Sequence, residues 1–402
     1  MQRNPARSLV LKAGSDKTQL ILKASMTQIK IPAVYMRGGS SKGVFFHAKD
    51  LPVEAAARDR LFLQVLGSPD SYQRQLDGMG GGLSSVSKAV IIEPSNRPEA
   101  DIDYTFAQVA VNRPIVDYSA TCGNLSSAVG PFAVDEGLLG VEDGKVTVRV
   151  YNTNTSKIFH AHFVVENKKA KVKGNFQIPG VSGTGAKIQL DFLDPGGSAA
   201  PTLLPTQSVQ DNIDIKGLGQ LQVSLVDATN PVVFVRAADL ACSGMESPET
   251  LEANSSLMGT LDEIRRKSGV LMKLAESPDK ISLANPKIGL VGNPSDFKTI
   301  DGVMVSQKDV DISIRMLSME KIHRAVPLTS AMCLATACKI TGSIPHQLAL
   351  QSESFVRIGN PSGVLPVGAD VIFEENNWQV NLIKVYRTAR RLMEGSVLVP
   401  EE

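Results

Sequence analysis

The segment Ala33-Val-Tyr-Met-Arg-Gly-Gly-Ser-Ser-Lys-Gly-Val-Phe-Phe-His-Ala-Lys-Asp-Leu51 reads as a strand, a polar turn and a second strand, and it ends in Ala-x-Asp-Leu. A second segment follows the same order when a two-residue gap is allowed: Ser224-Leu-Val-Asp-Ala-Thr-Asn-Pro-Val-Val-Phe-Val-Arg-Ala-Ala-Asp-Leu240. Chance is the alternative explanation of this weak similarity. A duplicated unit would give two similar halves, whose turns and helix starts meet at one interdomain cleft, a common place for a ligand.

Strand-like segments recur along the chain and outnumber the predicted helices. Each is rich in β-branched or aromatic residues and is bounded by Gly, Pro, Asn or Ser, which is typical of strands. The predicted strands are 28–35, 43–47, 88–92, 146–150, 157–165, 187–192, 221–226, 232–236, 288–291 and 310–316. Helical spacing and stop signals predict helices over 54–66, 124–137, 248–273 (one long or two shorter) and 328–341. Runs of strands with few helices favour an α+β fold over a doubly wound α/β fold.

The stretch Asp194-Pro-Gly-Gly-Ser-Ala-Ala-Pro-Thr-Leu-Leu-Pro205 lies near the middle of the chain and lacks any periodic pattern. Boundaries between domains fall in stretches of this composition. We therefore expect an N-terminal domain that ends at residue 205 and a C-terminal domain over 206–402. The length of 402 residues agrees with two or three domains, at about 150 residues each.

Composition excludes several classes of protein. Lys+Arg number 42 and Asp+Glu 41, so bulk charge predicts neither a nucleic acid nor a membrane surface as a partner. No apolar run approaches the roughly 18 residues that cross a bilayer, and the N-terminus is a poor signal peptide. The four cysteines form no CxxC pair, which predicts free thiols and a cytoplasmic location. The histidines form no metal-binding motif, so we predict no metal site.

The glycine-rich segment Asp77-Gly-Met-Gly-Gly-Gly-Leu-Ser-Ser-Val-Ser-Lys88 fits no complete phosphate-binding or acylation motif. Its glycines, Gly80 and Gly81 among them, can still expose backbone N–H groups as an anion cradle. Ser85 adds a hydroxyl, and Lys88 brings a charge to the start of an apolar strand. The alternative for Lys88 is a surface lysine on an edge strand. We favour a functional lysine because it directly follows the glycine and serine loop.

The segment Thr121-Cys122-Gly123-Asn124-Leu125-Ser126 places a cysteine at a predicted helix start. The helix dipole and the unpaired N–H groups there favour a thiolate and can hold a carboxylate. The alternative for Cys122 is a small buried apolar residue.

Three further polar segments are candidates for the cleft. The turn Arg37-Gly38-Gly39-Ser40-Ser41-Lys42 supplies two cations, Arg37 and Lys42, for an acidic substrate, or it is an ordinary hairpin turn. Asn230 lies in the matching turn of the second segment, and Asn-Pro also favours a plain turn. The segment Lys321-Ile-His323-Arg324 precedes the helix that begins near Thr329 and Ser330, and it would face the cleft; a solvated loop is the alternative for Lys321 and Arg324.

Together these segments resemble the PrpF family. The resemblance rests on Ile29–Phe46, Asp77–Lys88 and Cys122–Ser126, and continues through Asp227–Val235, Ser318–His323 and Thr388–Gly395. It covers nearly everything from Met26 onward, so residues 1–25 are expected to be a disordered extension or the result of an early start codon. The best-known members of the family are 2-methylaconitate cis–trans isomerases of the methylcitrate route for propionate.

The resemblance implies the fold of diaminopimelate epimerase. In that fold two similar halves each wrap a curved, mostly antiparallel sheet on a central helix, and the site lies between the halves. The epimerase uses one cysteine from each half, whereas here the second helix start has no thiol. The resemblance therefore implies Lys88 and Cys122 as the catalytic pair, with no cofactor. The residues expected to bind the substrate are Arg37, Gly38, Gly39, Ser40, Ser41, Gly80, Gly81, Ser85, Gly123, Asn124, Leu125, Asn230, His323, Thr329 and Ser330.

The implied reaction removes a proton from a carbon conjugated to carboxylates and returns it after the double bond has turned. A base near neutrality is needed, and lowering a lysine pKa from about 10.4 to about 7.4 costs roughly 4 kcal/mol. If nearby cations do not offset the substrate charge, Cys122 becomes the base and Lys88 the electrostatic clamp. Within the family, trans-aconitate and oxalomesaconate are alternative substrates. A non-catalytic accessory protein of an iron–sulfur methylcitrate dehydratase and an amino acid racemase are alternatives from other classes.

Overall fold

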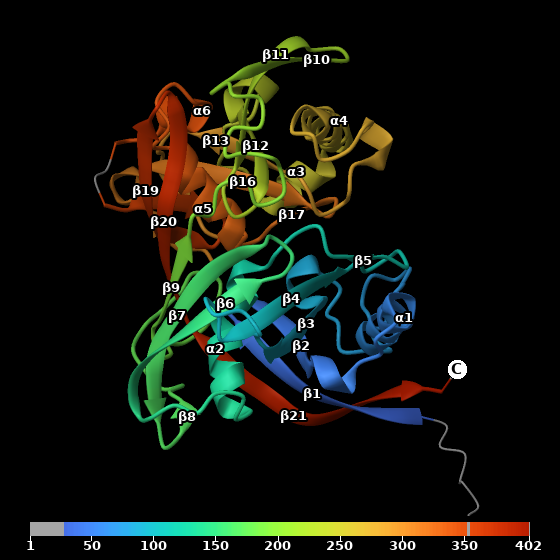
Figure 1. Ribbon diagram of the computed structural model, residues 1–402. Coiled ribbons are helices and arrows are strands. Elements are labelled where there is room, and N and C mark those ends of the chain that lie inside the picture. Colours follow the sequence, from blue (N-terminus) through green and yellow to red (C-terminus); the bar gives the residue numbers. More distant parts are fainter. Residues whose placement is uncertain (1–27, 352–353, 402) are drawn as a thin grey trace, which may run out of the picture.

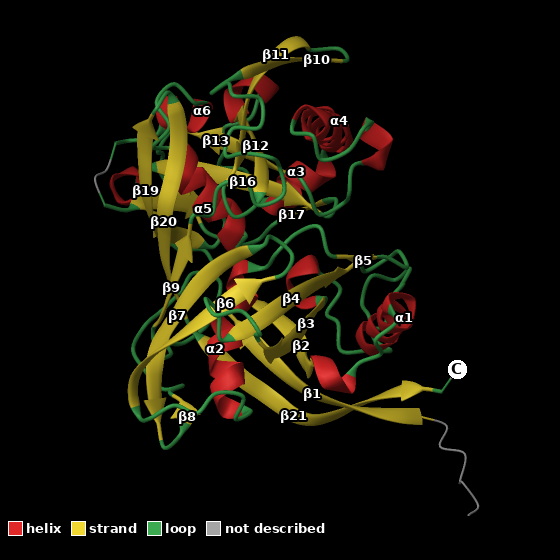
Figure 2. Cartoon of the chain, in the orientation of Figure 1, coloured by secondary structure: helices red, strands yellow, loops and turns green. Residues whose placement is uncertain are grey.

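The computed structural model describes residues 28–351 and 354–401, which form two lobes stacked on one another (Figure 1). The predicted extension over 1–25 lies outside these residues. Strands dominate both lobes, and most of their pairings are antiparallel (Figure 2). The fold therefore mixes a large sheet with few helices, as the α+β prediction expects.

The first lobe contains residues 28–193 and the C-terminal strand. Its helices are α1 (Ala55–Leu66) and α2 (Gly123–Asp135). Its strands are β1 (Gln28–Gly38), β2 (Ser41–His47), β3 (Lys88–Pro94), β4 (Ile102–Val109), β5 (Val116–Asp117), β6 (Gly144–Asn152), β7 (Lys157–Glu166), β8 (Lys169–Ala170), β9 (Ile188–Leu193) and β21 (Ala389–Pro400).

The second lobe contains residues 211–351 and 354–387. Its helices are α3 (Pro248–Ala253), α4 (Ser255–Leu271), α5 (Leu328–Ala337) and α6 (Ile344–Leu348). Its strands are β10 (Asp211–Ile215), β11 (Gly219–Asp227), β12 (Pro231–Arg236), β13 (Lys287–Gly292), β14 (Phe297–Lys298), β15 (Met304–Val305), β16 (Ile312–Ser318), β17 (Lys321–Ile322), β18 (Val356–Asn360), β19 (Gly363–Glu374) and β20 (Asn377–Arg387).

The strands of the two lobes pair in the same order. In the first lobe β1–β2 is antiparallel, β2–β3 parallel, β3–β4 antiparallel, β4–β6 parallel and β6–β7 antiparallel. In the second lobe β11–β12, β12–β13, β13–β16, β16–β18 and β18–β19 repeat this alternation. Both hairpins of the quoted segments end in a short 3₁₀ turn, at Ala48–Asp50 and Ala237–Leu240.

A buried helix lies against the sheet of each lobe. Every residue of α2 from Gly123 to Val134 is buried, and so is every residue of α5. Helix α2 contacts β1, β2, β7 and β9, while α5 contacts β11, β12, β18 and β19. Helices that are apolar on all sides need such complete burial, which explains why each becomes the centre of its lobe.

Most of the predicted elements are present. Helix α2 ends just before Gly137, whose φ of +70° is the left-handed conformation that glycine adopts readily. The expected helical stretch 248–273 forms two helices, α3 and α4, because Asn254 caps the second with its side chain. The strands β4, β18, β19, β20 and β21 were not predicted from the sequence.

The C-terminal strands connect the lobes. Strand β20 pairs with β9, and β21 pairs with β1 over its whole length from Gln28 to Gly38 (Figure 1). Residues 389–400 therefore complete the sheet of the first lobe, although they belong to the predicted C-terminal domain. The predicted boundary at residue 205 otherwise stays a prediction.

The predicted linker is held by a buried carboxylate. Asp227, at the end of β11, accepts hydrogen bonds from Ser198 Oγ (2.5 Å), the Ala199 N–H (2.7 Å) and the Ala200 N–H (2.6 Å). Buried backbone N–H groups need such partners. The connection between the lobes is thus fixed to the second hairpin.

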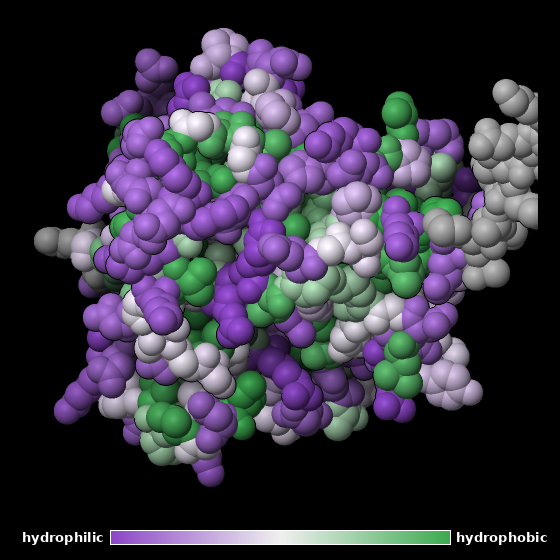
Figure 3. Space-filling model, turned by 90° about the horizontal axis from the view of Figure 1, so that it is seen from below, coloured by the Kyte–Doolittle hydropathy of each residue, from purple (hydrophilic) through white to green (hydrophobic). Residues whose placement is uncertain are grey.

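Hydrophilic residues cover much of the face seen from below, and hydrophobic residues lie between them in small groups (Figure 3). Small apolar groups of this kind are normal on a protein surface. Among the described residues, no helix has the length and apolar character that crossing a bilayer requires.

Candidate active site

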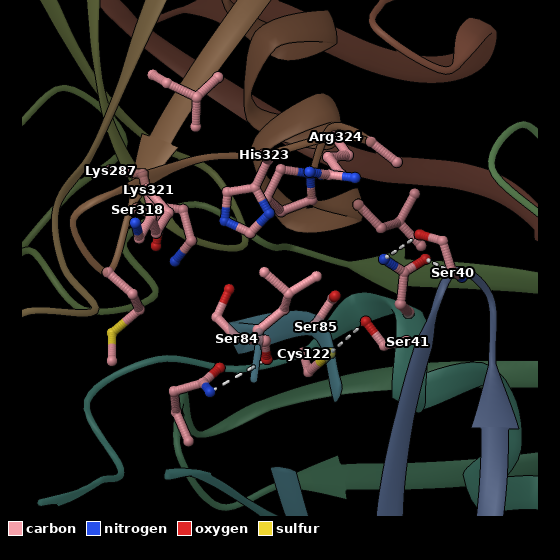
Figure 4. A pocket seen from close by; sticks show the side chains of 18 of the residues that line it. Ser40, Ser41, Ser84, Ser85, Cys122, Lys287, Ser318, Lys321, His323 and Arg324 are labelled. Carbon is pink, nitrogen blue, oxygen red and sulfur yellow. Dashed lines mark hydrogen bonds between the residues drawn. The ribbon is translucent and has the colours of Figure 1, made fainter. Parts of the chain in front are cut away.

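A cleft of about 480 Å³ lies where the two lobes meet. One wall carries Ser40, Ser41, Ser84, Ser85 and Cys122 of the first lobe, and the facing wall carries Lys287, Ser318, Lys321, His323 and Arg324 of the second (Figure 4). Lys88, Gly123, Asn124 and Thr329 also line it. The volume falls within the range of small-molecule sites. The structure thus brings Lys88 and Cys122, the predicted catalytic pair, into one cavity.

Lys88 is buried at the start of β3. Its Nζ donates to Gln108 Oε1 on the neighbouring strand (2.5 Å) and lies 4.8 Å from the centre of the Phe106 ring. The Gln108 amide N–H₂ donates to Ser87 O (2.9 Å), so the amide oxygen is fixed toward the amine. Burial lowers the pKa of Lys88, and the charge of a Cys122 thiolate opposes this change. An amine in these surroundings loses its proton more readily than a surface lysine.

Cys122 precedes the first residue of α2 and lies beside Ser41. Its Sγ is 3.9 Å from Ser41 Oγ, and its backbone oxygen accepts hydrogen bonds from Tyr104 Oη (3.3 Å) and Ser126 Oγ (3.1 Å). These bonds fix the backbone at the helix start. Within the described chain, no side chain caps α2, so its first N–H groups face the cleft without a side-chain partner.

The N-terminus of α5 meets that of α2 across the cleft. Within the part of the chain that the structure describes, Pro327 provides no side-chain cap for α5 either. A Cβ atom at Gly123 would lie 3.1 Å from Thr329 Cγ2, so the glycine lets the two helix starts approach. Two uncapped helix N-termini at one cavity favour a carboxylate ligand.

His323 reaches the cleft from the second lobe. Its buried Nε2 atom has no hydrogen-bond partner among the described residues. Burial, with smaller effects from the charges of Lys287 and Lys88, lowers the pKa of His323 to about 3. The imidazole is therefore neutral near pH 7, and it offers a hydrogen bond to a ligand rather than a charge.

Lys287 is a cleft residue that the sequence analysis did not identify. It begins β13, is buried, and its Nζ donates to Ala284 O (3.0 Å). Burial lowers its pKa to about 8; the charge of Lys88 contributes, whereas Asp117 and Cys122 act in the opposite direction. The internal similarity of the sequence could have identified Lys287, because Lys88 and Lys287 begin the corresponding strands.

Two exposed cations stand on the wall of the second lobe near its rim. Arg324 forms an ion pair with Glu249 (3.3 Å) in which both side chains are exposed, and Lys321 is exposed beside it. Both line the cavity. The cavity thus combines two buried amines with two exposed cations, which suits a ligand with several negative charges.

The comparisons with known proteins agree with this site. A family model described as PrpF protein matches residues 28–400. The chain belongs to the PrpF family. It is 41% identical over 379 residues to the 3-methylitaconate isomerase of Eubacterium barkeri, covering 92% of this chain and 98% of that protein. It is 38% identical over 387 residues to the 2-methyl-aconitate isomerase of Cupriavidus necator, covering 93% and 98%. These relatives confirm the predicted enzyme class, isomerase.

Solved structures extend the likeness to the fold. A methylitaconate-delta-isomerase has a TM-score of 0.75 and 40% identity, with 93% of this chain and 97% of that chain covered. A hydroxyproline epimerase has a TM-score of 0.53 at 11% identity, with 94% of both chains covered, which shows a shared fold alone. This PrpF-family chain therefore has the mixed α and β architecture of the racemases and epimerases.

Several predicted binding residues lie outside the lining of the cleft in this PrpF-family protein. Arg37 donates through Nη1 to Gly39 O and Thr388 O (both 2.9 Å), so its guanidinium closes the hairpin instead of reaching a ligand. A Cβ atom at Gly38 would lie 2.7 Å from Asn124 O, and Gly39 has a φ of +50°. These glycines let the hairpin approach α2, and that position brings the next residues, Ser40 and Ser41, to the cavity.

The glycine-rich loop does not form the expected cradle at Gly80 and Gly81. The Gln75 side chain occupies the inside of the loop: Gly82 N–H donates to Gln75 Oε1 (3.0 Å), and a Cβ atom at Gly80 would lie 2.2 Å from the same oxygen. Neither Gly80 nor Gly81 lines the cleft, whereas Gly82 and Ser85 do. The side-chain amide of Gln75 thus occupies the place inside the loop where an anion was expected.

Leu125, Asn230 and Ser330 also lie outside the lining. Leu125 is buried in the core, and Ser330 is buried one residue beyond Thr329. Asn230 Nδ2 donates to Asn285 Oδ1 (2.9 Å), and Asn285 Nδ2 donates to Ser119 O (2.5 Å). Asn230 therefore supports the segment that carries Lys287 and does not contact the cavity.

Among residues 28–351 and 354–401, no group of three or more His, Cys, Asp or Glu side chains is placed to hold a metal ion. All four cysteines are free thiols. The cytoplasmic location stays a prediction.

Proposed function

We propose that the protein is a cofactor-independent isomerase that converts 2-methyl-trans-aconitate to 2-methyl-cis-aconitate by removing and returning a proton. The observation that carries this proposal is the convergence of the Lys88 amine and the Cys122 sulfur on one buried cavity. The 2-methyl-aconitate isomerase among the relatives supports this choice of substrate. A place in the methylcitrate route of propionate breakdown is part of the proposal.

The charges of the cavity support a tricarboxylate. Lys287 is a buried amine, and Lys321 and Arg324 add exposed cations on the same wall. The N–H groups at the uncapped N-termini of α2 and α5 can each donate to a carboxylate oxygen. These groups stabilise three carboxylates without a metal ion.

The proposed reaction begins with a neutral Lys88. Its amine takes a proton from a carbon conjugated to the substrate carboxylates: the C–H bond breaks, an N–H bond forms, and the electron pair spreads into a dienolate. The former double bond then has single-bond character and turns. Return of a proton to the dienolate then fixes the cis isomer. Burial of Lys88 supports the neutral form that the first step needs.

The sequence analysis left open whether the substrate charge would keep Lys88 protonated. Its buried position works against protonation and lowers the pKa of Lys88, whereas the charge of Cys122 acts in the opposite direction. We therefore assign Lys88 as the base and Cys122 as a group that contacts the substrate beside it. Exchange of these two roles is the alternative, and the Cys122 variant described in the Discussion distinguishes the two assignments.

We also infer that the two lobes derive from one duplicated unit, as in diaminopimelate epimerase. The identical alternation of strand pairings and the two 3₁₀ turns after the hairpins support this inference. A duplicated unit places equivalent residues on opposite walls of one cleft.

The test is direct turnover. The purified protein is incubated separately with 2-methyl-trans-aconitate, trans-aconitate, 4-oxalomesaconate and 3-methylitaconate, and followed by ultraviolet absorbance and proton NMR. We expect the highest kcat/KM with 2-methyl-trans-aconitate. Faster turnover of 3-methylitaconate, the acid named for the Eubacterium barkeri relative, would reassign the substrate. No turnover of any acid by a folded protein would refute the enzyme proposal and favour the accessory protein.

A further inference from the structure

We propose that Lys287 is the second proton carrier of this reaction, acting on the substrate from the wall opposite Lys88. The proposal rests on the proposed function and goes beyond it, because it divides removal and return of the proton between two lysines. Three sets of observations carry it: the strand register, the surroundings of the amine, and the charge balance of the cavity.

The strand register makes Lys287 the counterpart of Lys88. The two Ala-x-Asp-Leu motifs, Ala48–Leu51 and Ala237–Leu240, align Val44 of β2 with Val233 of β12. Val44 pairs in parallel with Ala89, and Val233 pairs in parallel with Ile288. The residues immediately before these partners are Lys88 and Lys287. Each lobe therefore delivers one lysine from the same position of its sheet to the same cleft.

The amine of Lys287 is available to a ligand. In the described chain its Nζ donates one hydrogen bond, to Ala284 O, and it lines the cavity with Lys321 and His323 (Figure 4). An ammonium group has three N–H donors, so two remain. The Lys287 side chain is buried, and its amine forms no ion pair within 4 Å among the described residues. Burial of an unpaired ammonium group is unfavourable, so the stability of the fold does not explain a lysine at this position.

The charged and titratable groups around Lys287 come from several elements. Lys88 on β3 and Arg265 on α4 disfavour its ammonium form, whereas Asp117 on β5 and Cys122 before α2 favour it. Burial has the largest effect and lowers the pKa of Lys287 to about 8. Two neighbouring buried amines titrate as a coupled pair, so one is readily neutral while the other keeps its proton.

With one lysine neutral and the other protonated, the proton transfers of the proposed reaction balance. The neutral amine of one lysine takes the proton from the substrate carbon, and an ammonium forms there. The ammonium of the other lysine gives its proton to the dienolate, and a neutral amine remains. No charge is gained or lost by the pair, and exchange with solvent restores the starting state.

The decisive experiment follows a deuterium label. The substrate carries deuterium at the acidic carbon, and the product of early turnover in ordinary water is analysed by NMR and mass spectrometry. Two carriers predict a product without the label. A single lysine predicts that up to about a third of the product keeps it, because its ammonium holds the label among three hydrogens. Retention at that level in the wild type would overturn the proposal.

Two variants test the assignment to Lys287 itself. We expect Lys287→Gln and Lys287→Arg each to lower kcat by at least about 100-fold, the usual size of an acid–base contribution. We also expect the residual product of Lys287→Gln to retain label, because Lys88 then acts alone. Activity of Lys287→Arg within threefold of the wild type would instead show that a fixed charge suffices. Circular dichroism and thermal melting establish that each variant is folded.

A binding experiment separates this inference from the proposed substrate. Propane-1,2,3-tricarboxylate, which cannot isomerise, is titrated at pH 9 by calorimetry in buffers of different ionisation enthalpy. We expect the wild type to take up protons, because the trianion raises the pKa of Lys287, and Lys287→Gln to take up fewer. The control Lys321→Gln should lose affinity but keep the proton uptake. This result with no turnover of any acid would refute the proposed function alone, whereas equal uptake in Lys287→Gln would refute the role of Lys287.

Discussion

Lys88 and Lys287 occupy corresponding positions at the start of β3 and β13. Lys88 precedes Ala89, the parallel partner of Val44 in β2, and Lys287 precedes Ile288, the parallel partner of the corresponding Val233 in β12. Both side chains are buried, and both line the cleft between the lobes. A buried lysine has a high energetic cost unless its charge is removed or used. Two such residues at equivalent positions support the proposal that protons are transferred in this cleft.

Replacement of Lys88 should abolish turnover while leaving the fold intact. We expect Lys88→Ala to lower kcat/KM by about 10³-fold or more, because the substrate proton loses its first acceptor. The measurement is the absorbance assay with 2-methyl-trans-aconitate. The matched control is Lys145→Ala on β6, an exposed lysine outside the cleft, which should retain wild-type activity. An accessory protein would keep its effect on the dehydratase in the Lys88→Ala variant.

Replacement of Cys122 by serine should separate catalysis from stability. Serine is a favourable residue at a helix N-cap, so Cys122→Ser should melt at or above the temperature of the wild type. If Cys122 contacts the substrate beside the base, kcat should fall by roughly 10-fold to 100-fold, less than for Lys88→Ala. A larger loss than that of Lys88→Ala would show that the thiolate is the base and the lysine is the clamp.

The exposed cation Arg324 should contribute to binding and little to chemistry. Because exposed ion pairs are worth about 0.2–1 kcal/mol, Arg324→Ala should raise KM for a tricarboxylate roughly two- to fivefold with kcat nearly unchanged. The effect should shrink in high salt. A dicarboxylate such as 3-methylitaconate should be affected less, and an equal effect on both acids would contradict a third carboxylate at this wall.

Removal of the Lys287 amine should stabilise the folded protein at neutral pH. The folded-state pKa of Lys287 is about 8, below its unfolded value of about 10.4, so the unfolded chain binds more protons between these values. The contribution of Lys287 to the free energy of unfolding of the wild type therefore increases with pH between these two values. Lys287→Met should have the higher melting temperature below pH 8, and the difference should fade toward pH 10. A difference in melting temperature that stays constant with pH would show that burial does not disfavour the protonated form of Lys287.

The hydrogen bonds that Asp227 accepts from the linker between the lobes should contribute measurably to the free energy of unfolding. Asp227→Ala removes both carboxylate oxygens, so the Ala199 and Ala200 N–H groups lose their acceptor. We expect a loss of about 1–3 kcal/mol in the free energy of unfolding by urea, because buried donors lose their partner. Asp214→Ala, at an exposed position of β10, is the matched control and should change stability little.

Much of the local structure could be predicted because it depends on neighbouring residues. The hairpin turns, the helix that begins after Cys122 and the glycine that ends it all follow from spacing and backbone preference. The strands at the C-terminal end were missed because their patterns are mixed: β21 is exposed along most of its length and carries the charged residues Arg390, Arg391 and Glu394. Its place is set by pairing with β1, more than 350 residues away.

The sequence by itself indicated the α+β class and the two hairpin segments, because each depends on residue type and spacing, and the family resemblance implied that Lys88 and Cys122 share one site. Only the tertiary structure decided which polar groups reach the cleft. Arg37 and the glycine loop were taken up by internal carbonyl and amide groups, whereas Lys287, which the sequence analysis did not identify, was brought in from the second lobe beside the expected His323. The physical reason is that a backbone amide or carbonyl within reach satisfies a polar side chain as well as a ligand does, and long-range strand register determines which groups are within reach.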